Sequence, residues 1–404
     1  MKSRIVVDAR TIVNDVDGIG FYTVFFIKRL VSIFGETCHI IVILPLVRTD
    51  LSLFSAEERP YLHFVYYEQM AFSKDNRFDF DAWDTFIASL APDIYISTAF
   101  YPTRYPCCRI VVVHDLIPLL FPTEFAGEEE GRVALFERLM GDAAELCDLL
   151  VAVSDNTAKD IRQLYPQCQA AIKILHPDVA YTVQRVRREL ASEADGAVEH
   201  GRFLMVGVRR PRKNVELVIE ALKILKEQQI TDCKVYFIGT EDPDLVPLTH
   251  MIEANDLHEL AEHLDYVSDD EMYELINGSV GLLYPTFYEG FGMPIIEFLV
   301  ANKPILCQKT SSLPEVGGDL VEYCVSDGRS FAEAMLRVRR GQITPPQPAA
   351  VEAHLDQLIR KNQLQYSDLF NWILQRLQNQ TKRHAKNPLP LEAPRTTLFN
   401  STNH

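Results

Sequence analysis

The stretch Tyr288-Glu289-Gly290-Phe291-Gly292-Met293-Pro294-Ile295-Ile296-Glu297 decides how this chain folds. It follows the apolar run from Val280 to Tyr284, which is typical of a buried strand, and Pro285 ends that strand. The two glycines allow another molecule to approach the backbone closely. Pro294 suits the first residue of a helix, because its φ is fixed and it lacks an N–H. The sequence therefore predicts a strand, a glycine loop and a helix N-terminus in direct succession.

A helix N-terminus presents free N–H groups and the positive end of the helix dipole, so this construction suits an anion. Two carboxylates accompany it, Glu289 at the mouth of the loop and Glu297 in the first helical turns. Carboxylates do not bind anions, so the pattern predicts a ligand that joins an anion to hydroxyl-rich groups. An isolated Gly-x-Gly is more often an ordinary strand-to-helix turn with surface glutamates.

Strands alternate with helices twice along the chain, which is typical of two doubly wound parallel sheets. The first series runs from Arg4 to Leu175, and the second begins with the strand from Phe203 to Gly207. Residues 185–196 are charged, lack a core pattern and end in glycine, so we expect the linker there. We expect an N-terminal domain over residues 1–195, a C-terminal domain over 196–365, a crossover helix over 366–380 and a disordered tail over 381–404.

Composition narrows the class of protein. The 404 residues are 47% hydrophobic and 24% charged, as in an ordinary globular protein of two or three domains. A net charge of −16 argues against nucleic-acid binding, which needs a basic surface. The eight cysteines are scattered without a Cys-x-x-Cys pair, and we see neither a signal-peptide pattern nor a membrane-spanning run. We therefore expect a cytoplasmic protein with reduced cysteines, and peripheral contact with the inner face of the membrane stays open.

A basic loop follows the first strand of the second series, in the order Arg209-Arg210-Pro211-Arg212-Lys213-Asn214. Four cations within five residues of an acidic chain have two interpretations. One is a solvated turn. The other is a diphosphate site, in which arginine gives forked hydrogen bonds and lysine a point charge.

Two features of the first series are candidates for ligand contact. Gly18-Ile19-Gly20 opens an amphipathic helix, but Thr23 stands where a dinucleotide fingerprint has its third glycine. It is either a tight turn or a glycine loop that brings backbone amides near a phosphate or a sugar. His114 ends an apolar strand and precedes Asp115, and the carboxyl ends of parallel strands face the ligand crevice. His114 either caps the strand or touches substrate.

An Asp-x-Asp pattern, which can hold a divalent cation, occurs at Asp79-Phe80-Asp81. The same spacing recurs at Asp15 to Asp17 and at Asp242 to Asp244, so the pattern carries little information. The polar run around Asp79 precedes a helix, and we expect this pair to cap the helix or face solvent. No metal and no cofactor are expected.

Taken together, these segments resemble the retaining glycosyltransferases of family 4, and within them bacterial mannosyl- and rhamnosyl-type transferases. The resemblance rests on six segments in the family's order, namely Gly18–Tyr22, His114–Pro118, Asp148–Ser154, Pro211–Asn214, the Glu-x7-Glu motif Glu289–Glu297, and Ser311–Gly318. The chain departs from the family at Gly207-Val208, where many members have Gly-Arg, and at His176-Pro177-Asp178, where many have Pro-Asn-Gly.

The resemblance implies the GT-B fold, in which two Rossmann-like domains face each other across a cleft and a C-terminal helix crosses back to the N-terminal domain. It implies transfer of a hexose, mannose first, from a nucleotide diphosphate sugar to a glycan acceptor, with retention of configuration and in surface polysaccharide biosynthesis. The donor expected first is GDP-mannose and second a UDP-sugar. Whether the acceptor is lipid-linked stays open.

The resemblance also assigns roles to residues. The catalytic residues would be His114, Arg212, Lys213 and Glu289. The donor-binding residues would be Gly207, Arg209, Gly290, Phe291, Gly292, Met293 and Glu297. The acceptor or phosphate loop would be Gly18, Ile19 and Gly20. Two alternatives remain. The chain could be a catalytically silent GT-B protein that binds and assembles, or another GT-B sugar-nucleotide enzyme such as an epimerase or a phosphorylase.

Overall fold

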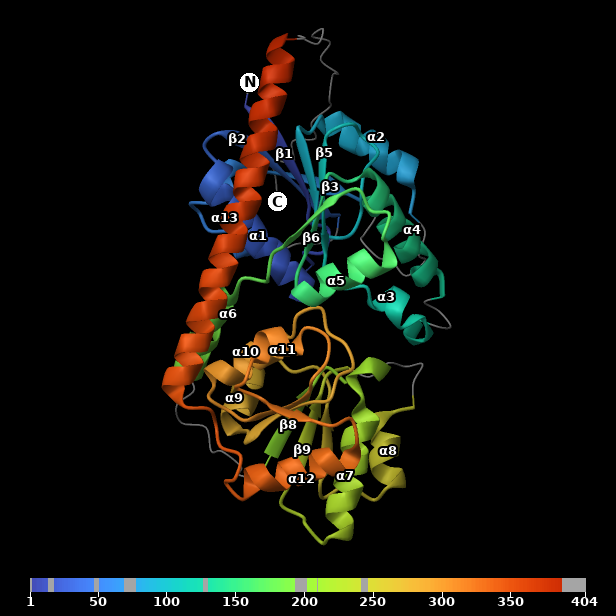
Figure 1. Ribbon diagram of the computed structural model, residues 1–404, viewed down its shortest axis with the longest axis vertical. Coiled ribbons are helices and arrows are strands. Elements are labelled where there is room, and N and C mark those ends of the chain that lie inside the picture. Colours follow the sequence, from blue (N-terminus) through green and yellow to red (C-terminus); the bar gives the residue numbers. More distant parts are fainter. Residues whose placement is uncertain are drawn as a thin grey trace, which may run out of the picture.

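The computed structural model describes residues 2–13, 18–46, 51–68, 78–125, 130–192, 202–208, 210–240 and 246–386. It contains two parallel sheets, each with helices on its faces, and Figure 1 shows them one above the other. In the part of the chain that is described, no helix is both long enough and apolar enough to cross a membrane.

The N-terminal sheet has seven strands in the order β3-β2-β1-β4-β5-β6-β7, and every neighbouring pair is parallel. Its strands are β1 (Ser3–Asp8), β2 (Cys38–Pro45), β3 (Leu62–Tyr67), β4 (Ile94–Ser97), β5 (Cys108–Val113), β6 (Leu149–Ala152) and β7 (Ala171–Ile174). The connecting helices are α1 (Gly18–Phe34), α2 (Phe80–Leu90), α3 (Ile117–Leu120), α4 (Glu130–Leu146) and α5 (Asp155–Leu164), with short 3₁₀ turns η1 (Leu51–Leu53), η2 (Arg59–Tyr61) and η3 (Pro122–Phe125).

The C-terminal sheet has six parallel strands in the order β10-β9-β8-β11-β12-β13. Its strands are β8 (Arg202–Val206), β9 (Lys234–Ile238), β10 (Ala261–Leu264), β11 (Gly281–Tyr284), β12 (Ile305–Gln308) and β13 (Glu322–Cys324). Its helices are the 3₁₀ turn η5 (Pro211–Lys213), α7 (Val215–Glu227), α8 (Leu248–Ala254), α9 (Asp269–Gly278), α10 (Met293–Val300), α11 (Leu313–Gly317) and α12 (Gly328–Arg339).

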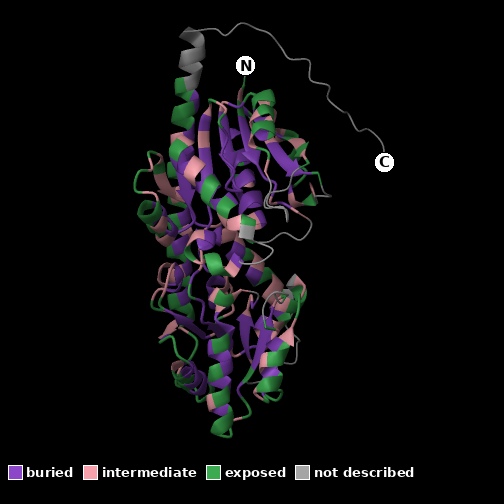
Figure 2. Ribbon diagram, turned by 90° about the vertical axis from the view of Figure 1, so that its right-hand side faces the viewer, coloured by how far each residue is buried: buried purple, intermediate pink, exposed green. Residues whose placement is uncertain are grey.

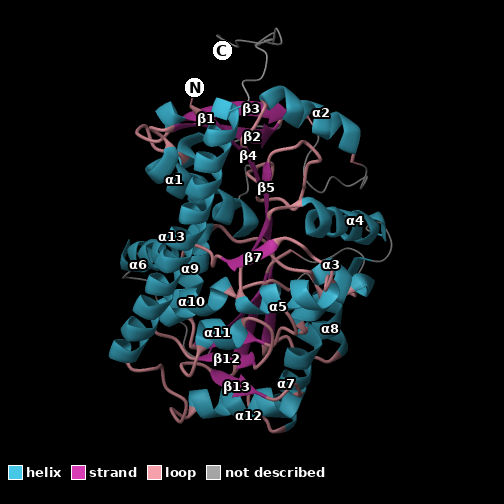
Figure 3. Ribbon diagram, turned by 45° about the horizontal axis from the view of Figure 1, so that its top comes forward, coloured by secondary structure: helices cyan, strands magenta, loops and turns pink. Residues whose placement is uncertain are grey.

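The central strands are buried and largely apolar because helices cover both faces of each sheet, with polar residues at the ends of β4 (Ser97) and β12 (Gln308). All four residues of β4, β6, β11 and β12 are buried, and Figures 2 and 3 show the strands in the middle of each domain with helices around them. In both sheets the strand order reverses next to the first strand, between β1 and β4 and between β8 and β11. Ligands of open α/β sheets bind at the carboxyl ends of the strands at this switch point.

Two long helices join the domains. α6 (Val179–Ser192) follows the last strand of the N-terminal sheet, and its Val179, Val183 and Val186 are buried in the core of the other domain. The expectation that residues 185–196 lack a core pattern is therefore wrong for their first part. The apolar positions lie four and then three residues apart, which is helical spacing, and the pattern begins before residue 185.

The C-terminal helix α13 (Pro348–Lys386) belongs to both domains. Val351, Leu355 and Leu358 pack in the core of the C-terminal domain, whereas Phe370 and Ile373 pack in the core of the N-terminal domain. Figure 1 shows this helix, in red, running along one side of both domains. The chain thus crosses back as expected. α13 begins before residue 366 and includes part of the segment expected to be a disordered tail, and residues 387–404 lie outside the described residues.

Candidate active site

The glycine loop and the basic loop meet at the switch point of the C-terminal sheet. Lys213 follows β8 and Glu289 follows β11, and their side chains form an ion pair with 2.7 Å between Nζ and Oε1. Gly207 has a φ of +81°, which favours glycine, and a Cβ there would lie 3.4 Å from Lys213 Nζ. The lysine therefore lies over a backbone that carries no side chain, and both predicted catalytic residues face the same point.

The glycine loop is held by hydroxyl groups of the segment that follows β12. Ser312 Oγ contacts the carbonyl oxygens of Glu289 and Phe291 at 2.9 and 2.7 Å, and the amide of Glu289 donates to Ser311 Oγ at 3.0 Å. Gly292, at a φ of +105°, stands at the N-cap of α10, which begins at Met293. Pro294 is thus the second helical residue, one position later than predicted. The N-terminus of α10 opens beside Glu289, as the sequence pattern predicts.

Arg212 points across the domain boundary. Its guanidinium bonds to Glu124 Oε2 at 2.8 Å, and its amide donates to the other oxygen of the same carboxylate. Glu124 belongs to η3 of the N-terminal domain and its side chain is almost fully buried. Arg210 also reaches this turn, where it donates to the Glu124 carbonyl at 3.2 Å. In this structure both arginines thus contact the opposite domain. Arg209 lies outside the described residues.

His114 lies at the carboxyl end of β5, as expected, and it is buried. Its Nε2 is 3.0 Å from the Thr98 carbonyl, and its ring packs edge-on against Tyr22 and Phe100 at 4.9 and 5.6 Å. Burial lowers the pKa of His114 to about 4, so the imidazole is neutral near pH 7. A neutral ring with one nitrogen bonded to a carbonyl is positioned rather than mobile.

The two domains touch at the glycine loop. Gly290 lies so close to β5 that a Cβ there would be 2.2 Å from the His114 carbonyl oxygen. Tyr288 donates its hydroxyl proton to Asp160 of α5 at 2.6 Å. These contacts place the predicted catalytic residues of both domains, His114 on one side and the glycine loop on the other, in one place.

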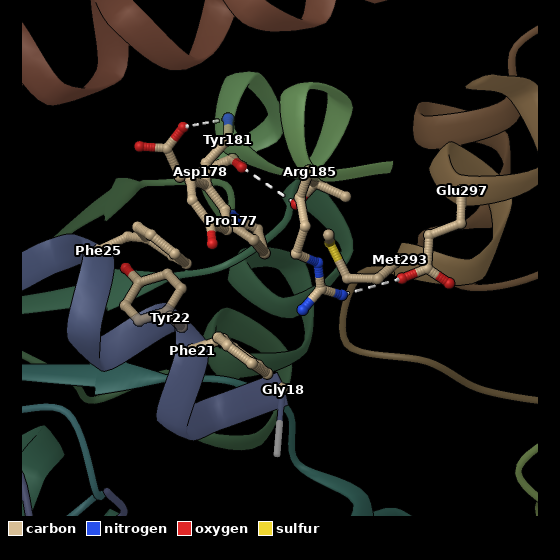
Figure 4. A pocket seen from close by; sticks show the side chains of 11 residues that line it. Gly18, Phe21, Tyr22, Phe25, Pro177, Asp178, Tyr181, Arg185, Met293 and Glu297 are labelled. Carbon is tan, nitrogen blue, oxygen red and sulfur yellow. Dashed lines mark hydrogen bonds and ion pairs between the residues drawn. The ribbon is translucent and has the colours of Figure 1, made fainter. Parts of the chain in front are cut away.

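A pocket of about 240 Å³ lies between α1, α6 and α10 (Figure 4). Its lining includes the aromatic rings of Phe21, Phe25 and Tyr181, and the Glu297 carboxylate, whose Oε1 is 3.8 Å from an Arg185 guanidinium nitrogen. Gly18 and Met293 line the same pocket. A predicted acceptor-side residue, Gly18, and two predicted donor-side residues, Met293 and Glu297, therefore border one cavity.

The predicted acceptor loop is part of a helix. Gly18, Ile19 and Gly20 form the first turn of α1, so their amides belong to a helix N-terminus rather than a free loop. A Cβ on Gly18 would meet no atom within 4 Å, so packing does not require glycine there. The centroid of the Phe291 ring lies 4.9 Å from that of the His176 ring.

The Asp-x-Asp pattern is resolved at one of its three places. Asp79 is the N-cap of α2 and accepts from the amide of Ala82 at 2.9 Å, while Asp81 is almost fully exposed. This confirms the expected capping role. The other two places, residues 15–17 and 242–244, lie outside the described residues. A different group, Asp155, His176 and Glu315, has ligand-type atoms within 4.8 Å of one another. Lys361 already pairs with Asp155 at 2.8 Å, so we assign no metal to this group.

The arrangement is suited to stabilising negative charge next to a polyhydroxylated group. An ammonium, a helix N-terminus and backbone amides of a glycine loop act on an anion without requiring a metal. A carboxylate such as that of Glu289 can accept hydrogen bonds from hydroxyl groups, and His114 of the opposite domain lies at the boundary. Contacts between domains at this point make the site complete only when the domains are together.

Three contacts were not predicted from the sequence. Glu124 is one acidic residue among many and its pairing with Arg212 depends on how the domains meet. Arg185 lies in the charged stretch expected to be a linker. The serine pair at Ser311 and Ser312 lies in a quoted motif, and two adjacent hydroxyls before Pro314 were the available signal that this segment anchors another loop.

Comparison with known proteins agrees with this geometry. Residues 188–363 match the family model described as glycosyl transferases group 1. The chain is 27% identical over 233 residues to the O-antigen chain mannosyltransferase B of Escherichia coli, covering 56% of this chain and 59% of that protein. It is 23% identical over 210 residues to the O-antigen chain mannosyltransferase RfbU of Salmonella typhimurium, covering 52% and 54%. The chain thus spans less than two thirds of the length of these relatives.

Solved structures share the architecture over nearly the whole chain. HepE of Anabaena, in complex with UDP and glucose, aligns with a TM-score of 0.61 at 14% identity and covers 91% of this chain and 100% of its own. WaaG, described as a glycosyltransferase involved in lipopolysaccharide biosynthesis, aligns at 0.58 and 14% identity, covering 89% and 95%. The chain therefore has the GT-B fold, residues 188–363 match the model of glycosyl transferases group 1, and the chain is similar in sequence to bacterial mannosyltransferases.

Proposed function

We propose that this protein transfers a hexose, mannose in the first instance, from a nucleotide diphosphate sugar to a glycan acceptor in the synthesis of a surface polysaccharide. The observation that carries the proposal is the Lys213–Glu289 pair at the mouth of the glycine loop, 2.7 Å apart and beside the N-terminus of α10. In this pair, the Lys213 ammonium is suited to stabilise a leaving diphosphate, and the adjacent Glu289 carboxylate is suited to accept hydrogen bonds from sugar hydroxyl groups.

The roles of the remaining residues follow from their positions. The amides of Gly292 and Met293 lie at the N-terminus of α10, where they suit the diphosphate. Glu297 faces the pocket beside Gly18 and Arg185, where it suits the ribose hydroxyls of the nucleotide. His114 closes the site from the N-terminal domain as a neutral hydrogen-bonding ring. Arg212 reaches a diphosphate after it exchanges the Glu124 carboxylate for the phosphate.

Mannose is favoured because the relatives of known activity are mannosyltransferases, and GDP-mannose is the corresponding donor. A UDP-sugar is the second candidate, since the structural neighbour HepE was solved with UDP and glucose. Retention of configuration is part of the proposal. A lipid-linked acceptor at the inner face of the membrane, reached from the cytoplasm, completes it.

The first experiment is a thermal-shift series with GDP, GDP-mannose, UDP and UDP-glucose. A ligand that binds only the native state raises the unfolding temperature in proportion to ln(1 + [L]/Kd). We expect the GDP pair to shift the wild type and to leave Lys213→Ala nearly unshifted. Lys223→Ala, which removes an exposed lysine of α7, is the matched control and keeps the full shift. Stabilisation by UDP compounds alone would overturn the mannose assignment, and no stabilisation by any of the four would overturn the nucleotide-sugar site.

Removing divalent metal ions with a chelator distinguishes metal-independent donor binding from metal-dependent donor binding. Because Lys213 and backbone amides suffice to hold a diphosphate, we expect the same donor affinity with and without EDTA, measured by calorimetry. The control is a known metal-dependent glycosyltransferase treated in parallel. If most donor binding were lost on chelation and restored by a divalent cation, the metal-free reading would be wrong.

A further inference from the structure

A polar cluster with a buried centre joins the two domains: the side chains of His176 and Glu315 are 0% and 16% exposed, and those of Lys361 and Asp155 on its rim are 44% and 54% exposed. It consists of Asp155 of α5, His176 between β7 and α6, Glu315 of α11 and Lys361 of α13, and it is called here the joint cluster. The Asp155 amide donates to both oxygens of Glu315, at 3.0 and 3.2 Å. Each domain, the segment between them and the crossover helix thus contribute one side chain.

The histidine of this cluster has unused hydrogen-bonding capacity. The His176 side chain is fully buried, neither ring nitrogen has a hydrogen-bond partner, and its Nε2 lies 3.9 Å from Glu315 Oε1. A buried polar group without a partner is costly, so a nearby donor is expected. A small rotation of Glu315 would let a protonated carboxyl group donate to this nitrogen.

The charges of the cluster do not balance when every carboxyl group is ionised. Asp155 and Glu315 supply two negative charges, Lys361 one positive charge at 2.8 Å from Asp155, and a neutral His176 none. One proton brings the net charge to zero, and Glu315, 16% exposed against 54% for Asp155, is the carboxyl group whose charged form burial disfavours more. Two further titratable groups bond to the end of α11, His354 of α13 to the Val316 carbonyl at 2.7 Å and Tyr323 of β13 to the Gly318 carbonyl at 2.8 Å.

We propose that Glu315 is a positioning residue that takes up one proton when the domains close, and that this protonated joint cluster holds the glycine loop against the N-terminal domain. The proton comes from solvent and stays on the Glu315 carboxyl group, which donates to His176 and lies against Asp155. This inference concerns domain closure and does not depend on the proposed transfer reaction.

The electrostatics of the cluster agree with one proton near neutral pH. Burial and the Asp155 charge raise the pKa of Glu315 to about 7, against the smaller opposing effect of Lys361 and of the Asp155 amide. Burial lowers the pKa of His176 to about 3. Burial raises the pKa of Asp155, but the hydrogen bond from Lys361 outweighs it and the pKa is lowered overall. Between pH 5 and 8, Glu315 is thus the member of the cluster that titrates.

The direction of the pH effect follows from the raised pKa. In open molecules the solvated Glu315 carboxyl group has its ordinary pKa of 4.5, and in closed ones it binds its proton up to about pH 7. The bound proton therefore makes its full contribution to the free energy of domain closure below about pH 4.5. This contribution decreases as the pH rises from about 4.5 to about 7, and it is absent above pH 7.

The joint cluster can act on the glycine loop through two contacts. The His176 ring packs 4.9 Å from that of Phe291, and Ser312, three residues before Glu315, holds the carbonyl oxygens of Glu289 and Phe291. Proton loss at Glu315 leaves two carboxylates against one lysine at the domain boundary. Repulsion there would loosen the same segment that fixes the loop.

The test uses the full chain without any ligand. Small-angle X-ray scattering from pH 5 to 8.5, at constant ionic strength, reports the radius of gyration. Infrared spectra over the same range report the carboxylic acid band of a protonated Glu315. For the wild type we expect the radius to increase and one acid band to disappear, with a midpoint near pH 7. Glu315→Gln, which is neutral at every pH, should stay compact and lack the titrating band.

Two further variants make the sign of the effect testable. Asp155→Asn removes the charge that raises the pKa of Glu315, so its midpoint should move to lower pH. Lys361→Met removes the charge that lowers that pKa, so its midpoint should move to higher pH. Glu322→Gln is the matched control. It changes a β13 carboxylate that pairs with Arg337 of α12, and we expect it to keep the wild-type curve.

Several outcomes would overturn the proposal. They are a wild-type radius that is constant from pH 5 to 8.5, a titrating band that persists in Glu315→Gln, and shifts in the same direction for Asp155→Asn and Lys361→Met. Loss of the pH dependence on adding EDTA would show that a metal ion, not a proton, supplies the missing charge. If Glu315→Gln failed to fold, the opposite shifts of the other two variants would still decide.

Discussion

At the scale of single residues, Lys213 is the side chain on which the proposed chemistry depends most. We expect Lys213→Ala to lower kcat/KM by a factor that corresponds to about 2–4 kcal/mol of transition-state stabilisation, as for the loss of one preorganised electrostatic donor. The change also leaves the Glu289 carboxylate, only 12% exposed, without its partner. Steady-state kinetics with GDP-mannose measure the effect, with Lys223→Ala as the control.

An unchanged kcat/KM in Lys213→Ala would assign the diphosphate to the neighbouring arginines. Arg212→Ala then becomes the informative variant, because it frees Glu124 as well as removing a cation. A protein that kept its unfolding temperature while losing turnover would place the effect in the site and not in the fold.

The two glutamates of the motif should have different kinetic effects. In the proposed reaction the sugar gains positive character beside Lys213 and Glu289, so Glu289→Gln should mainly lower kcat. Glu297 lies in the pocket near Arg185, and ribose contacts there are similar in the ground and transition states, so Glu297→Gln should mainly raise the KM of the donor. Initial rates over a range of donor concentrations distinguish the two. Turnover abolished by Glu297→Gln and unchanged by Glu289→Gln would reverse the assignment.

At the scale of elements, local pattern predicted the order of strand, glycine loop and helix around Gly290 and Gly292. Short-range sterics determine such a unit: an apolar strand, glycines with positive φ and a proline in the first helical turn. The same signals placed Lys213 on the neighbouring loop and His114 at the end of β5. They also placed Gly18 at the opening of an amphipathic helix, where α1 begins, but they did not decide between a free loop and a first helical turn for Gly18, Ile19 and Gly20.

Gly290 should tolerate no side chain while the domains are closed. Its Cβ would lie 2.2 Å from the His114 carbonyl oxygen, so Gly290→Ala must separate the two elements. Misplacement by about 1 Å costs on the order of 10²-fold in rate, and we expect a loss of that size in kcat. Gly141→Ala is the control, because a Cβ there meets no atom within 4 Å in the middle of α4. Equal turnover in Gly290→Ala and wild type would show that the domains react while further apart than in this structure.

At the scale of the whole molecule, α13 should contribute to the stability of the N-terminal domain although it follows the C-terminal one. Phe370 is buried in the N-terminal core, so Phe370→Ala should lower the free energy of unfolding by about 3–5 kcal/mol. Leu364→Ala, on the same helix and 72% exposed, should change it by less than about 0.5 kcal/mol. Urea unfolding followed by circular dichroism measures both. If Phe370→Ala and Leu364→Ala changed the free energy of unfolding by similar amounts, the packing of α13 would not contribute to the stability of the N-terminal domain.

Contacts between the domains were the part of the site that the sequence did not predict. Glu124 with Arg212, Tyr288 with Asp160, and Glu315 with Asp155 are more than 80 positions apart in each pair. No local periodicity links such residues, because their distance depends on how two finished sheets are oriented. The resemblance to a known family implies that the two domains face each other across a cleft, but it does not specify which residues pair across the boundary.

Because α13 packs in the cores of both domains, the N-terminal domain cannot complete its core early in synthesis. The last strand of the N-terminal sheet ends at Ile174, yet its core is completed by Phe370, Ile373 and Leu377, about 200 residues later. A ribosome that adds 5–20 residues per second needs roughly 10–40 s to reach them. During that interval the nascent first domain displays the apolar strip that Phe370 will cover, which is a surface for a chaperone to occupy. The first domain to emerge is thus among the last to finish folding.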